Sequence, residues 1–261
     1  MLVQLTADVH GAHERLKSLC DPDLPLWLLG DNLNLVDFHS LGGVASRVLR
    51  KRDIARILFA LSAKGAKAAL AVADDVFFRN PEVQRRAEVE ISKEYNKLKA
   101  ILPPEATVLH GNVDWPDLLA KALGATYLDA GVKELAGVRV GFLSGTGAYP
   151  YSMRLPGERP DEEYAKLMWS LGKVDILCTH FPPAVDGLTY DAVATRDEGG
   201  GRMLNDYLLE MKPKLHFFGH IHNPQLAEAM LGETRLVNVG GFRARGKLFV
   251  LNLDSLEVSS R

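Results

Sequence analysis

The chain contains little cysteine, no excess of either charge and no long apolar run, and each shortage excludes a class of protein. The two cysteines, Cys20 and Cys178, are too few for a disulfide framework, and Cys178 lies in an apolar stretch typical of a core strand. The formal net charge of −2 gives no electrostatic reason to expect nucleic acid or an anionic membrane as a partner. No apolar run approaches the ~20 residues that a membrane-spanning helix needs. We therefore expect a soluble protein with no stable nucleic-acid partner and no membrane span.

The N-terminal residues are typical of a strand rather than of a targeting signal. Leu2–Ala7 is a short apolar run without the basic region and longer apolar stretch of a signal peptide, so we predict a cytoplasmic location. A chain of 261 residues could form one large domain or two small ones. At this size about three quarters of the unfolded chain's surface can be buried, which is enough for a core without covalent cross-links.

Short apolar runs, many of them followed by glycine, alternate with stretches that have helical spacing. Such runs are typical of strands buried on both faces. The strands predicted in this way are Leu2–Ala7, Leu26–Leu29, Thr107–His110, Val138–Ser144, Val174–Thr179 and Lys214–Phe218. Between residues 225 and 258, alternating runs at 226–230, 235–239 and 247–253 predict an antiparallel meander. By itself this periodicity predicts an α/β fold and nothing finer.

The segment of about 40–76 is longer than a connection between two strands requires. It has an apolar stripe at helical spacing, made of Ile54, Ile57, Leu58 and Leu61. Cationic side chains crowd the rest of the predicted helix: Arg47, Arg50, Lys51, Arg52 and Arg56. We predict a helical insertion here. Its role is left open between a helix packed on the domain, a cap that offers positive charge to an anionic substrate, and a contact in a homo-oligomer. Contact with a membrane surface is ranked last, because the rest of the chain is not basic.

Five short patches of polar residues follow predicted strands, and each offers a carboxylate, an amide or an imidazole. They are Asp8-Val9-His10, Gly30-Asp31-Asn32, Gly111-Asn112-Val113-Asp114, Thr179-His180 and Gly219-His220-Ile221-His222. These ligand types suit divalent Mn, Fe, Zn or Ni. Asp8 and His10 lie two residues apart, and in strict strand geometry both would point to one face. Because the patches extend from residue 8 to residue 222, a division in the middle would split the site, and we predict one domain over residues 1–261.

In this order, each after a strand, the patches resemble the calcineurin-like metallophosphoesterases, from residue 8 to about residue 242. The resemblance implies a four-layer αββα sandwich, here with the helical insertion added. It implies that one metal ion is held by Asp8, His10 and His222, that a second is held by Asn112, His180 and His220, and that Asp31 bridges both. We predict Asp31, Asn112 and His180 as the catalytic residues. Asp114 is expected to orient a ligand histidine through its other ring nitrogen.

Two divalent transition-metal ions are therefore the expected cofactor, with manganese placed first and iron, zinc and nickel as alternatives. A pair of ions held roughly 3.5–4 Å apart can lower the pKa of a shared water to near neutrality. The resulting metal-bridging hydroxide can attack a phosphate in line, while the ions hold the phosphate oxygens.

The third patch departs from the usual pattern, because the family commonly has Gly-Asn-His-Asp or Gly-Asn-His-Glu where this chain has Val113. In much of the family that histidine assists the leaving group, and general-acid help is typically worth about 10²–10⁴-fold. Members with cysteine or arginine there act on diesters or pyrophosphates. We therefore predict a dimetal phosphodiesterase acting on a small phosphodiester or nucleotide-like substrate. The alternatives are a phosphomonoesterase or nucleotide-pyrophosphate hydrolase of the same superfamily, and a non-catalytic metal-binding scaffold.

Some features near the patches have two interpretations. Residues 238–241, Asn-Val-Gly-Gly, resemble the family's Asn-Pro-Gly-Ser turn, and they are either a plain turn or a site-facing one. The remaining histidines, His13, His39, His110 and His216, are predicted to be surface or core residues, with His13 and His39 the two that could face the site.

Overall fold

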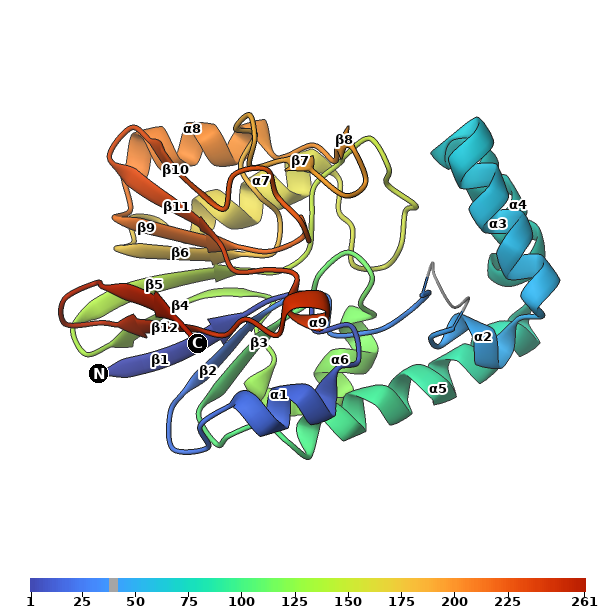
Figure 1. Cartoon of the computed structure of the whole chain (residues 1–261), viewed down its shortest axis with the longest axis horizontal. Coiled ribbons are helices and arrows are strands. Elements are labelled where there is room, and N and C mark those ends of the chain that lie inside the picture. The colour runs from blue at the N-terminus through green and yellow to red at the C-terminus, as the bar shows by residue number, and fades with distance from the viewer. Residues whose placement is uncertain (38–41) are drawn as a thin grey trace.

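The computed structural model describes residues 1–37 and 42–261 and consists of two packed sheets with helices on both outer faces (Figure 1). In order of pairing, the first sheet contains β13 (Val258–Ser260), β12 (Phe249–Asn252), β1 (Leu2–Thr6), β2 (Leu26–Leu29) and β3 (Ala106–Leu109). The second contains β10 (Glu228–Leu231), β11 (Thr234–Asn238), β9 (Leu215–Phe218), β6 (Ile176–Thr179), β5 (Val138–Leu143) and β4 (Ala130–Leu135). A small separate ribbon pairs β7 (Tyr190–Asp191) with β8 (Arg196–Asp197).

The helices divide between the two outer faces. The first sheet is covered by α1 (His13–Leu19), α5 (Pro81–Lys99) and α6 (Pro116–Leu123), which is followed by a 3-10 turn, η2 (Gly124–Thr126). The second sheet is covered by α7 (Asp161–Ser170) and α8 (Arg202–Met211), and a short helix, α9 (Phe242–Arg245), lies at one end of the strands (Figure 1). This arrangement confirms the predicted α/β, four-layer sandwich.

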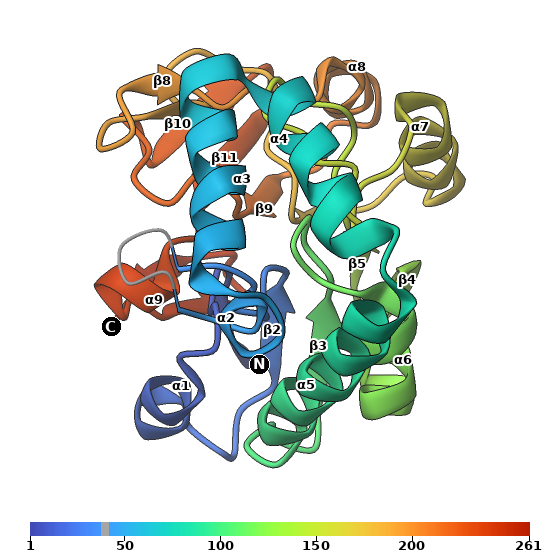
Figure 2. The same ribbon diagram turned by 90° about the vertical axis from the view of Figure 1, so that its right-hand side faces the viewer.

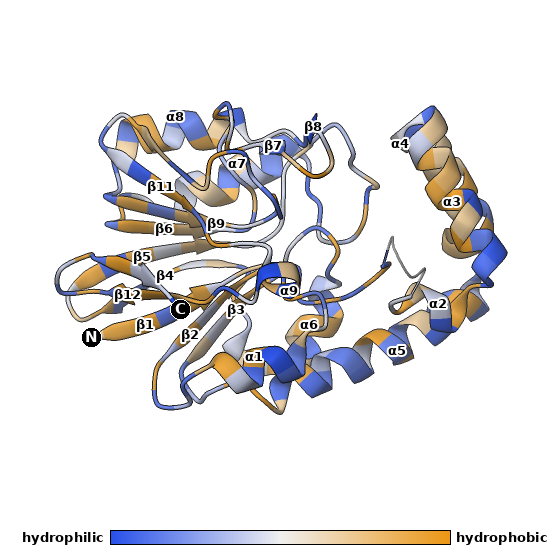
Figure 3. Ribbon diagram, in the orientation of Figure 1, coloured by the Kyte–Doolittle hydropathy of each residue, from blue (hydrophilic) through white to orange (hydrophobic). Residues whose placement is uncertain are grey.

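The strands β2, β3, β6 and β9 are buried along their whole length because each sheet is covered on both sides, whereas α5 alternates hydrophilic and hydrophobic residues (Figure 3). In β2, Trp27 and Leu29 pack in the cluster between the sheets, while Leu26 and Leu28 pack under the helices of the first layer. Trp27 meets Phe142 of the other sheet edge-on, with ring centroids 5.2 Å apart. Such a pair is worth about 0.5–1.5 kcal/mol beyond its buried area. Cys178 belongs to the same central cluster, which confirms its prediction as a small core residue.

The C-terminal strands do not form the predicted antiparallel meander. β10 and β11 are antiparallel, but β11 runs parallel to β9, and β12 leaves for the other sheet, where it pairs with β1. The chain changes sheets through Gly241 and α9, which turn it away from the end of β11. Alternating burial is the same in either arrangement, so the sequence pattern did not distinguish them.

The predicted insertion contains a helical hairpin. α2 (Ala45–Val48) leads to α3 (Lys51–Lys64) and α4 (Ala66–Ala73), and a π-helical turn, η1 (Asp74–Phe78), joins α4 to the region of α5. The start of the predicted insertion, Ser40, lies outside the described residues. α3 and α4 pack mainly against each other and stand in front of the strand ends when the molecule is viewed from that side (Figure 2). Extended backbone at Leu49 separates Arg47 from the other cationic residues, so the predicted single helix is two helices.

Candidate metal centre

The predicted ligands come from loops that follow the carboxyl ends of parallel strands. Asp8 and His10 follow β1, Asp31 follows β2, and Asn112 follows β3, while His180 comes directly after β6. His220 and His222 follow β9, which is parallel to β6. Parallel strands end at one edge of a sheet, and the two sheets place their edges side by side. The fold thus brings together residues that are more than two hundred positions apart in the sequence.

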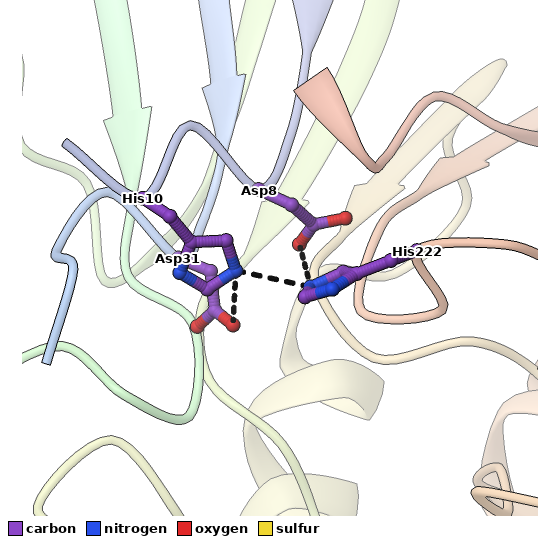
Figure 4. A group of neighbouring side chains, drawn as sticks. All are labelled: Asp8, His10, Asp31 and His222. Atoms are coloured by element: carbon purple, nitrogen blue, oxygen red, sulfur yellow. Dashed lines mark hydrogen bonds and ion pairs between the residues drawn. The ribbon is translucent and has the colours of Figure 1, made fainter. Parts of the chain in front are cut away.

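The first group of side chains consists of Asp8, His10, Asp31 and His222, each of which offers a ligand atom within 4.8 Å of the others (Figure 4). The Nε2 atoms of His10 and His222 are 3.0 Å apart. His10 Nε2 is also 3.6 Å from Asp31 Oδ2, and His222 Nε2 is 4.0 Å from Asp8 Oδ1. These distances make the group a candidate metal site.

The second group lies on the other side of Asp31. Asn112 Oδ1 is 3.2 Å from His180 Nε2 and 3.0 Å from His220 Nδ1. His180 Nε2 is 3.4 Å from Asp31 Oδ1, whereas Asp31 Oδ2 is the oxygen near His10. One carboxylate therefore turns one oxygen toward each group, as a bridging ligand requires.

The hydrogen bonds of two histidines determine which ring nitrogen offers a lone pair. His10 Nδ1 lies 3.1 Å from the carbonyl oxygen of Leu33, and His180 Nδ1 lies 2.8 Å from that of Leu29. A carbonyl oxygen can only accept, so each Nδ1 carries the proton and each Nε2 offers a lone pair. Both Nε2 atoms face oxygens of Asp31. The nitrogen lone pairs therefore face carboxylate oxygens, and both kinds of atom are hydrogen-bond acceptors. A cation on each side would satisfy both Nε2 lone pairs and both Asp31 oxygens, whereas a single proton on Asp31 could satisfy only one of the two contacts.

Burial reinforces this fit. It lowers the pKa of His10 to about 3 and that of His220 to about 3, which keeps both rings in the neutral form that binds metal. Burial and the neighbouring carboxylates of Asp8 and Asp114 raise the pKa of Asp31 well above its usual value. The centre therefore lacks positive charge, which a divalent ion would supply.

Several of these residues have left-handed backbone, which side chains other than glycine rarely adopt. Their φ angles are 59° at Asp8, 42° at His10, 53° at Asp31 and 71° at His220. Main-chain bonds hold the turns: the amide of Asp8 donates to Gly30 O at 3.0 Å, and that of His10 donates to Asp31 O at 2.9 Å. Asp8 and His10 thus reach one centre through turns and not through strict strand alternation. Backbone strain of this kind is concentrated at functional sites.

The turn at 238–241 faces the site. Asp8 Oδ2 accepts a 2.7 Å hydrogen bond from the amide of Gly241, and Asp8 Oδ1 accepts one of 3.1 Å from that of His220. A Cβ added to Gly240 would lie 2.1 Å from Asp8 Oδ2, so a side chain cannot be placed there without moving the carboxylate. Of the two interpretations of this turn, the structure supports the site-facing one.

Asp114 has a different role from the predicted one. Its carboxylate accepts from the amides of Gly111, Asn32 and Leu33 and from the hydroxyl of Tyr95, at 2.9–3.1 Å. None of these partners is a ligand histidine, and the Nδ1 atoms of His10 and His180 donate to main-chain carbonyls. The expectation that Asp114 orients a ligand histidine is therefore wrong, and its carboxylate instead ties the second and third patches together.

The remaining histidines lie in the protein interior where the structure describes them. His13, His110 and His216 are buried, as one of the two interpretations predicts, and His39 lies outside the described residues.

Two residues that no sequence motif indicated, Tyr149 and Glu158, lie on a loop beside the second group. The Tyr149 hydroxyl is 3.1 Å from Asn112 Nδ2, and Glu158 Oε1 is 2.9 Å from that hydroxyl.

Comparison with known proteins gives a family and a fold. The model of the family described as calcineurin-like phosphoesterase matches residues 1–224. None of the curated proteins matches the sequence. TT1561 of Thermus thermophilus superposes with a TM-score of 0.56 at 15% identity, over 100% of this chain and 97% of that chain. The phosphopantetheinyl hydrolase of Mycobacterium tuberculosis gives 0.50 at 14% identity, over 93% and 92%. At such identities the superpositions support the fold alone.

Among the described residues, no helix combines the length and the apolar character needed to cross a membrane.

Proposed function

Because the chain belongs to the calcineurin-like phosphoesterase family, we propose that it is a metal-dependent phosphodiesterase acting on a small phosphodiester or nucleotide-like substrate. The observation that supports this most is the convergence of unprotonated nitrogens and carboxylate oxygens on two adjacent positions that share Asp31. A non-catalytic scaffold could lose metal ligands without penalty, whereas this chain keeps all seven. The whole chain is proposed to form one phosphoesterase domain, and the free thiols of Cys20 and Cys178 favour a cytoplasmic location.

In this proposal Asp8, His10 and His222 hold one divalent ion, and Asn112, His180 and His220 hold the other, with Asp31 between them. Manganese is placed first, and iron, zinc or nickel suits the same donors. When bound, the two ions would activate a water molecule for attack and neutralise charge on the phosphate oxygens.

The chain's own residues prepare the site before substrate arrives. The carbonyls of Leu33 and Leu29 hold the rings of His10 and His180 with Nε2 turned inward. The main-chain amide of Val113 donates to Asp31 Oδ1 at 3.1 Å and fixes the bridging carboxylate. A site held in this way needs little rearrangement during the reaction, which is the source of most electrostatic catalysis.

The side chain of Val113 supports the preference for diesters. Valine cannot donate a proton to a leaving group, so the reaction should depend on leaving groups that depart without one. The chromogenic substrate bis-p-nitrophenyl phosphate is a phosphodiester, and its leaving group, p-nitrophenolate, departs without a proton. The monoester p-nitrophenyl phosphate has the same leaving group, so the pair isolates the effect of the phosphate itself.

The test is to measure metal content and hydrolysis of both chromogenic substrates, with and without a chelator. We expect about two divalent ions per chain, faster hydrolysis of the diester, and loss of activity with chelator. A panel of cyclic nucleotides, short single-stranded nucleic acid, nucleotide sugars and monoesters then identifies the substrate class. Preference for monoesters or nucleotide sugars would favour the alternative hydrolases, and a protein without metal or turnover would overturn the proposal.

A further inference from the structure

The loop between β5 and α7 is fastened to the third ligand patch. The amide of Gly145 donates to His110 O at 2.7 Å, and that of Thr146 donates to Gly157 O at 3.3 Å. A Cβ added to Gly157 would lie 2.0 Å from the carbonyl oxygen of Gly111, so only glycine allows this approach. The loop is therefore built against the backbone that carries Asn112.

Glu158 organises the middle of this loop. Its carboxylate accepts from the amides of Met153 and Arg154, at 3.2 and 2.8 Å, and from the hydroxyl of Ser152. It also accepts from the hydroxyl of Tyr149, at 2.9 Å. A carboxylate that collects several donors from one loop fixes that loop, and here it also fixes the direction of the Tyr149 proton.

That direction determines how the Asn112 amide is turned. Because the Tyr149 proton points to Glu158, the hydroxyl oxygen can only accept from Asn112, which must present its Nδ2 group. Asn112 Oδ1 is then left facing His180 Nε2 and His220 Nδ1, as a metal ligand must. An amide has nearly the same shape after a half-turn, so packing alone would not prevent Oδ1 from facing the wrong way.

We propose that Tyr149, held by Glu158, is a positioning residue that keeps the Asn112 amide in its ligating orientation and so sets the affinity of the second metal position. This inference rests on the proposed function. Partners that orient a ligand from outside the coordination sphere typically contribute about 10–100-fold to metal affinity.

Tyr149→Phe isolates the hydroxyl from the ring. The ring packs against His220 with centroids 5.0 Å apart and against Phe181 at 6.3 Å, and phenylalanine keeps both contacts. The loop offers a matched control in Tyr151, whose ring lies 3.8 Å from the guanidinium carbon of Arg196. Tyr151→Phe makes the same chemical change on the same loop and keeps that cation–π contact.

The test is calorimetric titration of the metal-free full-length proteins with Mn²⁺, with bound metal measured after dialysis. We expect two binding events in the wild type, and in Tyr149→Phe a second event weakened about 10–100-fold while the first changes little. Tyr151→Phe should match the wild type. Equal weakening of both events, together with a lower melting temperature of the metal-free protein, would mean a merely structural effect and would overturn the inference.

A double substitution distinguishes an effect on the orientation of the Asn112 amide from an unspecific structural effect of Tyr149→Phe. Asn112→Asp has oxygens on both sides, so Tyr149→Phe in that background should weaken the second event several-fold less than it does in the wild type. An unchanged penalty would overturn the positioning role. If the wild type binds two ions and Tyr149→Phe binds them equally well, only this inference fails. If the wild type binds fewer than two, the proposed function fails with it.

Discussion

The strand edge that carries the ligands and the α3–α4 hairpin face each other, but they are held by different forces (Figures 1 and 2). At the edge, Asp8 and His180 are fully buried; the Asp8 carboxylate accepts two main-chain hydrogen bonds, and the His180 ring donates one. In the hairpin, the Asp53 carboxylate forms ion pairs with Arg50 (Nε to Oδ2, 2.8 Å) and Arg56 (Nη1 to Oδ1, 3.5 Å). Both arginine side chains are more than half exposed. The Asp53 carboxylate is itself covered, but water and salt screen its pairs with exposed arginines, whereas fully buried polar networks fix one geometry. The side-chain positions are therefore fixed more firmly at the strand edge than in the hairpin.

Asp31→Asn should give the largest effect and tests the edge. The fold should survive, because asparagine can keep the 3.1 Å bond from the Val113 amide through its oxygen. Loss of the bridging charge should remove one or both metals and lower kcat by about 10²–10³-fold or more. Asp53→Asn is the matched change in the hairpin, and it should lower stability while leaving metal content and kcat for the small diester near wild type. An Asp31→Asn protein with two metals and full turnover would remove Asp31 from the bridge.

Val113→His should change the selectivity at the edge by roughly tenfold or more, within the typical range of general-acid catalysis. The substitution restores a proton donor, so hydrolysis of monoesters should rise relative to diesters. The measurement is the ratio of kcat/KM for aliphatic monoesters and diesters in both proteins. A wild type that already prefers simple monoesters would contradict the role given to valine.

The hairpin should affect only larger substrates, and by less. If it acts as a cap, Arg50→Ala combined with Arg56→Ala should raise KM for larger phosphodiesters roughly 3–10-fold, as expected for two exposed charges. The small chromogenic diester has no remote groups and should be hydrolysed with unchanged KM. Arg235→Ala, which removes an exposed arginine paired with Glu228 on β10, is the control. Unchanged KM for every substrate would leave the hairpin with a structural or oligomer-forming role, which sedimentation would distinguish.

A smaller effect is the pH dependence of stability. It should come from the sandwich, which contains buried histidines, since residues 45–78 contain no histidine. Burial lowers the pKa of His216 from 6.5 to about 3, so the folded state keeps this ring neutral. Stability from this group is complete above pH 6.5 and is lost as the pH falls toward 3, because only the unfolded chain then takes up the proton. The melting temperature of the metal-free protein should fall over this range, and His216→Phe should reduce that slope. An identical slope in the variant would contradict the assignment.

The sequence predicted the edge better than the hairpin for physical reasons. Buried strands leave a strong apolar pattern, so β2 was predicted residue for residue and the ligand patches followed from strand ends. The left-handed backbone of Asp8 and Asp31 left no such pattern, since it depends on hydrogen bonds between distant loops. Tyr149 and Glu158 were missed because their roles arise only when their loop meets Asn112. In the insertion, the break at Leu49 before α3 and the pairing of arginines with Asp53 depend on tertiary context that a helical period does not record.

The most direct test of the shared bridge is to titrate the metal-free protein with Mn²⁺ while following bound metal and hydrolysis of bis-p-nitrophenyl phosphate together. If Asp31 joins two ions that act as one centre, turnover should stay near zero through the first equivalent and rise with the second. Full turnover at one ion per chain, or in the presence of chelator, would contradict the two-ion centre.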